Sequence, residues 1–219
     1  MALLRTFGEI GGARFVGVGT CAEYDWSAQR FVEDETLILP RTLYGKAKAA
    51  MAAAADAFSA RYGFSAAWAR IFQPYGPGEA QQRLIPSIIN SLIAQRPISL
   101  SEGTQERDFI YAPDVADLLV RLLAADGAIG PFNVGTGRAT SVRAVAECIA
   151  DRFSARHLLT FGSLSSGADE PHRMVADMGK VTSQLSWPEP TPVQLGLRAT
   201  VDDAVAQRHA VRLMPTEPS

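Results

Sequence analysis

The sequence is poor in cysteine and histidine, and it has no long apolar run. Its two cysteines, Cys21 and Cys148, make no disulfide framework, so we expect a reduced, cytoplasmic protein. The three histidines, His157, His172 and His209, lack the paired spacing of metal ligands, so we expect no metal site. No stretch is long and apolar enough to span a bilayer, and the first residues lack the apolar core of a signal peptide.

The sequence also has no large excess of positive or negative charge. The chain has 21 Lys and Arg against 23 Asp and Glu, a formal net charge of -2, and no cluster of basic residues. This balance argues against a nucleic-acid binder. The 47% of hydrophobic residues is typical of a globular protein, and 219 residues suffice for one large domain or two small ones.

The first part of the sequence predicts a strand, a helix and a second strand. Residues 14–19 are apolar without polar alternation, which suits a buried parallel strand. Residues 42–61 are rich in alanine and other strong helix formers, and Gly63 is placed to end that helix. Residues 64–70 form the second strand. This order predicts a right-handed βαβ unit in an α/β fold.

The remaining chain alternates short strands, helices and loops. Residues 71–78 are interrupted repeatedly by proline and glycine, which predicts a loop. We expect further helices at 1–8, 83–95, 113–123, from 142, at 177–185 and at 193–206, strands at 97–100, within 102–111 and at 131–134, a loop at 25–40, and a frayed tail after 211.

Tyr44 and Lys48 are the strongest candidates for chemistry. Because they lie four residues apart in a predicted helix, they project from one face, one turn apart. An ammonium near a phenol lowers the phenol pKa, which makes Tyr44 a candidate general acid/base. Thr20 ends the first strand, where ligands collect in parallel sheets, and its hydroxyl could orient a carbonyl or alcohol. The pattern Tyr-x-x-x-Lys alone often occurs by chance on amphipathic helices. The surrounding segments therefore decide whether it indicates a catalytic pair.

Other patterns have structural interpretations beside functional ones. Residues 135–137, Gly-Thr-Gly, lack the Gly-Lys-Ser/Thr ending of a phosphate loop, and a strand-to-helix turn explains them better. The serines of residues 163–167 do not form Gly-x-Ser-x-Gly, so a hydrolase has no support. Arg107 either binds a ligand or pairs with Glu106 or Asp108.

Five segments in order resemble the extended short-chain dehydrogenase/reductase family, and most closely its NAD(P)-dependent nucleotide-sugar epimerases, dehydratases and 4-ketoreductases. The resemblance extends from Arg14 to about Trp187. It implies a partial Rossmann-type parallel sheet with a smaller mixed α/β substrate-binding lobe. Residues 1–78 would be the C-terminal half of the NAD(P)-binding domain, and residues 79–219 mainly the nucleotide-sugar lobe, with some segments returning to the Rossmann domain. The matching segments are Phe15 to Tyr24, Tyr44-Gly45-Lys46-Ala47-Lys48, Arg70 to Gly78, Gly103 to Phe109, and Phe132 to Gly137.

The resemblance implies a catalytic role for each of three residues. Lys48 would hold the nicotinamide ribose of NAD or NADP and lower the pKa of Tyr44. Tyr44, also in contact with the cofactor, would exchange a proton with a sugar hydroxyl or ketone. Thr20 would hydrogen-bond the same sugar oxygen. A hydride would move between a sugar carbon, C4 being favoured, and the nicotinamide.

The resemblance also implies binding residues and a partner. Ile71 would contact the cofactor, Gln73 would stand at the substrate where the family usually has asparagine, and Arg107 would bind the diphosphate. A homodimer is implied through the helix at 42–61 and the helix before it. We expect neither a nucleic-acid nor a membrane partner.

The chain departs from the family pattern in its glycines and in its acids. The family begins with a strand and a Gly-x-x-Gly-x-x-Gly turn that seats the cofactor pyrophosphate, whereas this chain starts where the fifth strand is about to begin. Gly17 and Gly19 have the wrong spacing for that turn. The 4,6-dehydratases place two acids directly after the catalytic threonine, and here those positions are Cys21 and Ala22. Glu23, if extended, faces the other way. Reduction or epimerisation is therefore favoured over dehydration.

Two functional hypotheses follow. The first is an oxidoreductase or epimerase of nucleotide-activated hexoses, in its most specific form a 4-ketoreductase with Tyr44 as proton donor. The second is a truncated, catalytically silent remnant that binds nucleotide sugars, because the glycine-rich third is absent. A late diphosphate arginine expected before Glu170 is also missing, which predicts altered nucleotide contacts.

Overall fold

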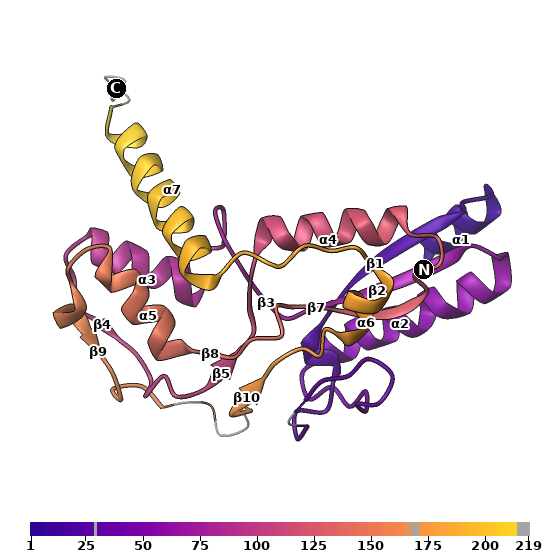
Figure 1. Ribbon diagram of the computed structural model, residues 1–219, viewed down its shortest axis with the longest axis horizontal. Helices are drawn as coiled ribbons and strands as arrows, with labels where there is room; N and C mark the ends of the chain where they lie inside the picture. The colour runs from indigo at the N-terminus through magenta and orange to yellow at the C-terminus, as the bar shows by residue number, and fades with distance from the viewer. Residues whose placement is uncertain (29, 166, 168–170, 214–219) are drawn as a thin grey trace. The chain divides into compact units, whose positions relative to one another are not determined.

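Three parallel strands form the first sheet of the computed structural model (Figure 1). They are β1 (Arg14–Thr20), β2 (Ser65–Ile71) and β7 (Gly130–Val134), in the order β1-β2-β7. The register pairs Thr20 with Ile71 and Ile71 with Val134, so the carboxyl ends of all three strands meet at one edge. The structure describes residues 1–28, 30–165, 167 and 171–213. The parallel pairing predicted for the first two strands is confirmed.

The chain divides into two compact units. The first comprises residues 1–74, 106–139 and 171–190, and the second comprises residues 75–105, 140–170 and 191–219. The first unit contains all six residues predicted from the sequence to take part in catalysis or binding: Thr20, Tyr44, Lys48, Ile71, Gln73 and Arg107.

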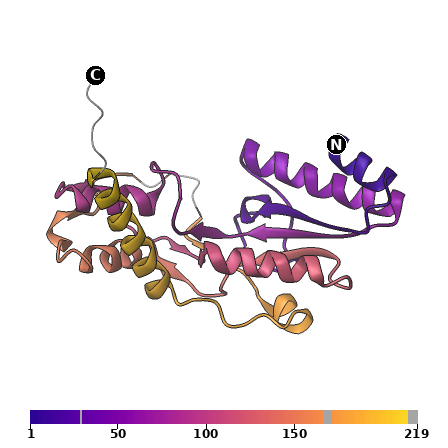
Figure 2. The same ribbon diagram turned by 90° about the horizontal axis from the view of Figure 1, so that it is seen from above.

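Helices cover both faces of the β1-β2-β7 sheet (Figure 2). Helices α1 (Ala2–Glu9) and α2 (Leu43–Tyr62) lie on one face, and α4 (Ala112–Ala124) lies on the opposite face. Helix α2 begins where the Thr42 hydroxyl accepts the Gly45 N–H at 3.0 Å. It ends at Gly63, whose φ of 77° is the left-handed conformation expected of a glycine C-cap.

Apolar side chains fill the space on both sides of this sheet. The cluster beneath α4 includes the fully buried Ala69, Leu118, Leu122, Phe132 and Val134. The cluster beneath α1 and α2 includes Leu4, Ala55, Phe64, Ala66 and Trp68. Alanines of both α2 and β2 belong to this second cluster or pack against it.

Two predictions for the first unit need correction. Residues 71–78 were expected to be loop throughout, but Gln73–Tyr75 form a short strand, β3, and the Gln73 N–H donates to the Asp108 carbonyl at 3.0 Å. The single strand expected within 102–111 is divided into β5 (Glu106–Arg107) and β6 (Phe109–Tyr111). Asp108 separates them, and the two strands belong to different sheets: β6 pairs with β3. Strand β5 pairs in parallel with β10 (Arg173–Met174), and the short helix α6 is Gly179–Gln184.

The second unit is mainly helical. Its helices are α3 (Leu84–Ile93), α5 (Val142–Asp151) and α7 (Val193–Leu213), and its strands are β4 (Ile98–Ser99), β8 (Thr140–Ser141) and β9 (Leu159–Thr160). Strands β4 and β9 pair in parallel, and Ser141 caps α5 by accepting the Ala144 N–H at 3.1 Å. Tyr75 is buried, and its hydroxyl donates to the Val193 carbonyl at 3.1 Å, which is a packing role. The tail expected to fray extends into 214–219, outside the described residues.

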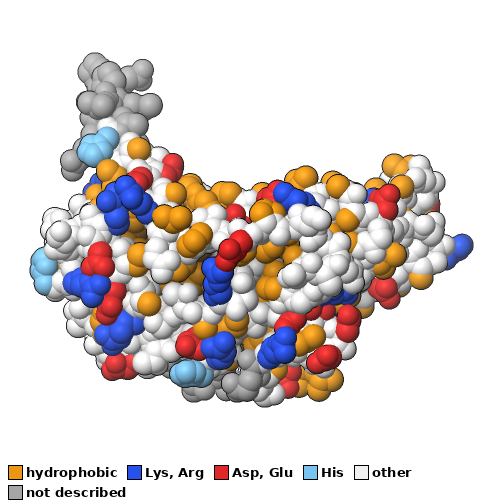
Figure 3. Space-filling view, viewed as in Figure 1, with side chains coloured by type: hydrophobic (Ala, Val, Ile, Leu, Met, Phe, Trp, Pro, Cys, Tyr) orange, Lys and Arg blue, Asp and Glu red, His pale blue; other side chains and the backbone are white. Residues whose placement is uncertain are grey.

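The described part of the chain has neither a membrane-spanning helix nor a cluster of metal-binding side chains. There, no helix combines the length and apolarity needed to cross a membrane, and no three His, Cys, Asp or Glu residues group closely enough to hold a metal ion. On the face drawn in Figure 3, positive and negative side chains are interspersed.

Asp108 fixes the turn that follows β7. Its buried carboxylate accepts the Thr136 N–H at 2.7 Å, the Thr136 hydroxyl at 2.6 Å, the Gly137 N–H at 2.9 Å and the Ala176 N–H at 3.1 Å. Burial raises the pKa of Asp108, and these donors oppose that rise. Residues 135–137 are thus a turn held by a carboxylate; it leads from β7 into the two-residue strand β8, which directly precedes α5.

We predict that Asp108→Asn destabilises the fold, because the amide has one acceptor oxygen and turns an NH₂ group toward buried N–H donors. The free energy of unfolding should fall by about 2–3 kcal/mol in urea titrations. The matched control is Asp117→Asn, which removes an exposed ion pair with Arg121 and should cost less than about 0.5 kcal/mol. An unchanged unfolding midpoint for Asp108→Asn would contradict this account.

Candidate active site

Thr20 ends β1 and begins the 3₁₀ turn η1 (Cys21–Glu23). It is 8% exposed, and its hydroxyl accepts the Ala22 N–H at 3.3 Å. Because Thr20 lies beside Ile71 in the sheet register, these two nominated residues are neighbours at the carboxyl edge.

Glu23 was expected to face away from the site if its segment were extended, but the segment is not extended. Residues 21–23 form a turn, and this turn directs the Glu23 carboxylate back to accept the Thr20 N–H at 2.9 Å. Glu23 is fully buried. Its carboxylate therefore does not face a ligand at the sheet edge.

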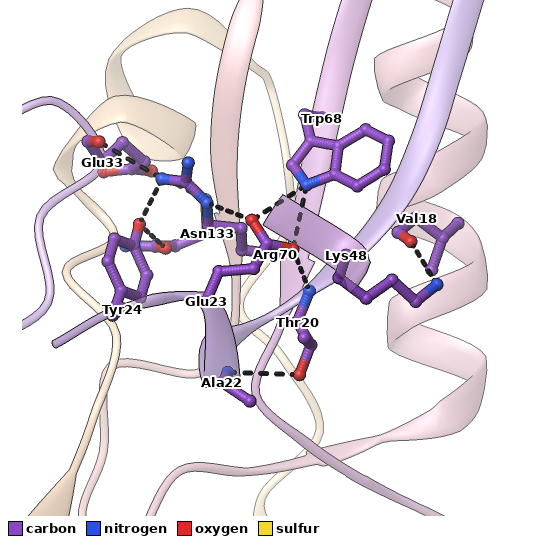
Figure 4. Close-up of polar contacts among 10 residues, drawn as sticks. All are labelled: Val18, Thr20, Ala22, Glu23, Tyr24, Glu33, Lys48, Trp68, Arg70 and Asn133. Atoms are coloured by element: carbon purple, nitrogen blue, oxygen red, sulfur yellow. Dashed lines mark hydrogen bonds and ion pairs between the residues drawn. The ribbon is translucent and has the colours of Figure 1, made fainter. Parts of the chain in front are cut away.

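Tyr44 and Lys48 lie together in the first turns of α2. The Lys48 ammonium is 5.9 Å from the centroid of the Tyr44 ring. It also donates to the Val18 carbonyl of β1 at 2.7 Å, as Figure 4 shows. The Tyr44 side chain is 58% exposed. A cation therefore stands beside an accessible phenol, next to the strand that ends in Thr20.

Gly45 allows the start of α2 to pack directly against η1. A Cβ atom at position 45 would lie 2.3 Å from the Ala22 carbonyl oxygen, so only glycine permits this approach. Tyr44 precedes Gly45, and Ala22 follows Thr20 by two residues. This close contact is how the fold brings the Tyr44 segment to the Thr20 turn.

A second tyrosine near the site, Tyr24, has a different environment. It is fully buried, donates its hydroxyl to Asn133 Oδ1 at 2.7 Å, and accepts from Arg70 Nη1 at 3.0 Å. Burial raises its pKa, and the Arg70 charge only partly opposes this. Tyr24 is therefore a structural tyrosine.

Arg107 and Gln73 lie on segments close to the carboxyl edge. Arg107 is 5% exposed, and its Nη1 donates to the carbonyls of Glu106 at 2.7 Å and His172 at 3.3 Å. The Glu106 carboxylate forms an ion pair with Arg173. Gln73 is half-buried, immediately after the end of β2. The segment before Glu170, where a further arginine was expected, includes residues 166 and 168–170, which lie outside the described residues.

Three interior residues were missed from the sequence: Trp68, Arg70 and Asn133. Trp68 and Arg70 both donate to Glu23, and Asn133 joins Tyr24 to the end of β7. A usable signal existed, because an arginine in an otherwise apolar buried strand requires an acidic partner. A cavity of about 360 Å³ between α2 and β2 borders Glu23 and Arg70 and is otherwise lined mainly by alanines.

We predict that Cys21 is unreactive in the folded protein. Burial raises the pKa of its thiol to about 12, so only roughly one molecule in 10⁴ carries a thiolate at pH 8. In a Cys148→Ser variant, an aromatic disulfide reagent should label nothing in native buffer and one thiol in guanidinium chloride. Rapid labelling of the native protein would show that the Cys21 environment is open.

Comparison with known proteins gives a family match. A model of the NAD dependent epimerase/dehydratase family matches residues 1–135 of this chain. The chain is 26% identical over 200 residues to dTDP-D-glucose 4,6-dehydratase of Mus musculus, covering 89% of this chain and 56% of that protein. It is 30% identical over 138 residues to UDP-glucuronic acid decarboxylase 1 of Arabidopsis thaliana, covering 62% of this chain and 31% of that protein. It therefore spans only part of these relatives' length.

Solved structures of this fold superpose closely. MoeE5 in complex with UDP-glucose and NAD matches with a TM-score of 0.85 and 26% identity, covering 94% of this chain and 69% of that one. The UDP-N-acetylglucosamine 4-epimerase from Methanobrevibacter ruminantium M1, in complex with UDP-N-acetylmuramic acid, matches with a TM-score of 0.86 and 21% identity, covering 94% and 67%. These matches confirm the predicted α/β fold with its parallel sheet. Since the family model covers 135 of the 219 residues, this chain belongs to the NAD-dependent epimerase/dehydratase family.

Proposed function

We propose that this protein is an NAD(P)-dependent oxidoreductase or epimerase that acts on a nucleotide-activated sugar, with hydride transfer at C4 and Tyr44 as general acid/base. The observation that carries this proposal is the accessible Tyr44 phenol beside the Lys48 ammonium, on a helix whose start is packed against the Thr20 turn. Family membership supports a nicotinamide cofactor, and relatives have been solved with NAD and nucleotide sugars.

The residues present fit the nicotinamide-ribose part of such a cofactor. An ammonium carries three N–H donors; Lys48 directs one to the Val18 carbonyl, and a ribose hydroxyl would receive another. Ile71 would contact the nicotinamide ring from the sheet edge. When bound, the cofactor supplies or accepts the hydride.

The proton chemistry belongs to the chain itself. Tyr44 would donate its proton to a ketone oxygen during reduction, or remove one from a hydroxyl during oxidation. The Thr20 hydroxyl would bond the same sugar oxygen and so fix its direction.

Two features bear on the substrate. Cys21 and Ala22, which follow Thr20, carry no acidic group, and Glu23 is buried beneath them, so we propose reduction or epimerisation rather than dehydration. We propose Gln73 and Arg107 as the sugar and diphosphate contacts. Backbone carbonyls orient the Arg107 guanidinium, a forked cation of the kind that suits phosphate oxygens.

We predict that Tyr44→Phe lowers kcat by about 10²-fold or more, because it removes the acid/base. Reduction is followed by absorbance of NADH or NADPH with UDP-4-keto-6-deoxy-D-glucose, and epimerisation, which regenerates its cofactor, by chromatographic separation of UDP-glucose from its C4 epimer. Tyr62→Phe, on the same helix, is the matched control and should leave kcat unchanged. Absence of turnover by the wild-type chain would favour the silent, nucleotide-sugar-binding remnant.

We also propose a homodimer through α1 and α2, whose outer surfaces expose Leu3 (74%) and Met51 (53%). The native mass should then be twice the chain mass of 23.5 kDa. Ala50→Arg, on the exposed side of α2, should give a monomer, whereas Val120→Arg on the exposed side of α4 should not change the mass. A wild-type mass of one chain would contradict the dimer.

A further inference from the structure

The buried Glu23 carboxylate, beneath the proposed site, accepts hydrogen bonds from three different residues (Figure 4). One oxygen, Oε1, accepts the Thr20 N–H at 2.9 Å and the Trp68 indole N–H at 3.0 Å. The other, Oε2, accepts Arg70 Nε at 3.0 Å and the same indole N–H at 3.1 Å. Each oxygen therefore has its own donor, a backbone N–H for one and a guanidinium for the other, and these two bonds fix the orientation of the Glu23 side chain.

Arg70 connects this carboxylate to the rest of the sheet. Its Nη1 donates to the Tyr24 hydroxyl at 3.0 Å and to the Glu33 carbonyl at 3.3 Å. Tyr24 in turn donates to Asn133 on β7. The turn after β1 is thereby fastened to β2 and β7 through side chains alone.

Gly19 leaves the space that these bonds need. A Cβ atom at position 19 would lie 2.2 Å from Trp68 Nε1 and 2.4 Å from Glu23 Oε1. The glycine preceding Thr20, which has no place in a phosphate-binding turn, is thus required for the indole to reach the carboxylate.

A buried ion pair is a costly way to gain stability, since well-packed apolar residues of similar size often stabilise a fold as well or better. An apolar residue at position 23 could not accept the Thr20 N–H. The specific consequence of a carboxylate here is therefore a fixed position for the main chain of Thr20. The Thr20 hydroxyl, which accepts the Ala22 N–H, is turned by the same η1 geometry.

We propose that Glu23, locked by Arg70 and Trp68, is a positioning residue that holds Thr20 in the orientation needed to bond the reacting sugar oxygen; this rests on the proposed function. Glu23 touches neither substrate nor cofactor and acts only through Thr20. Misplacement of an orienting group by about 1 Å costs up to about 10²-fold in rate. The loss should appear in kcat, because the Thr20 contact strengthens at the transition state.

The first test is Glu23→Gln, because a glutamine has one acceptor oxygen and cannot serve Thr20 and Arg70 together. We expect kcat to fall about 10- to 100-fold with KM changed by less than about threefold. In a Thr20→Val background the same substitution should have little further effect, because its target hydroxyl is gone. Equal losses in both backgrounds, or an unchanged kcat, would overturn the proposal.

The matched control is Glu33→Gln. Glu33 is also a buried carboxylate, and it accepts the Asn133 N–H at 2.8 Å without touching Thr20. The Glu33→Gln substitution should lower the unfolding midpoint. Its kcat, measured below the unfolding temperatures of variant and wild type, should stay near the wild-type value. If Glu23→Gln does not fold, Trp68→Phe is tested in its place. This substitution keeps the ion pair and removes the indole donor, and we expect it to lower kcat by about 2- to 10-fold. That loss too should vanish in the Thr20→Val background.

Amide hydrogen exchange tests the same idea without turnover. The Thr20 N–H should exchange at least about tenfold faster in Glu23→Gln than in wild type, and at the wild-type rate in Glu33→Gln. An unaltered Thr20 rate in Glu23→Gln would overturn the positioning role. If wild type turns over none of the substrates, the proposed function fails, and the exchange rates still decide whether Glu23 holds Thr20.

Discussion

The parallel register of β1, β2 and β7 is the constraint on which the rest of the first unit depends. It places Thr20 beside Ile71 and Ile71 beside Val134, so three chain segments leave the sheet at one edge. The nominated residues lie on or next to those segments. Because a shift by one residue would turn every side chain of a strand to the opposite face, the apolar packing of β2 against α4 and α2 also determines the geometry of the proposed site.

Two buried carboxylates convert strand ends into fixed turns. Glu23 accepts the N–H of Thr20, and Asp108 accepts the N–H groups of Thr136, Gly137 and Ala176. An ionised carboxylate accepts hydrogen bonds at two oxygens and donates none, which suits it to gathering backbone donors. These bonds offset the desolvation of each charge. One of these turns is therefore held by a carboxylate of its own, Glu23, and the other by the Asp108 carboxylate of a neighbouring segment.

The local features of this fold were predictable, whereas the interior polar network was not. Helix α2, its cap at Gly63 and the facing of Tyr44 toward Lys48 depend on residues within a few positions of one another. The Glu23–Arg70 pair joins residues 47 positions apart, and the Tyr24–Asn133 bond joins residues 109 positions apart. The bond between the Thr20 N–H and Glu23 is local, part of a capping box in η1, whereas the Trp68 and Arg70 donors that hold the same carboxylate come from β2. The strand at Gln73–Tyr75 was missed for the same reason, since its N–H meets Asp108 from a later segment.

Burial and charge balance separate two tyrosines that both stand beside a cation. The Arg70 guanidinium lies 4.7 Å from the Tyr24 ring centroid, and the Lys48 ammonium lies 5.9 Å from that of Tyr44. The charge of Arg70 is balanced by Glu23, the Tyr24 hydroxyl is used on Asn133, and burial raises the pKa of that phenol. Lys48 donates to the neutral carbonyl of Val18, and the Tyr44 ring is exposed. Of these two tyrosines, only Tyr44 presents an accessible phenol, and the cation beside it bonds a neutral carbonyl; this difference favours Tyr44 over Tyr24 as the proposed proton-transfer group.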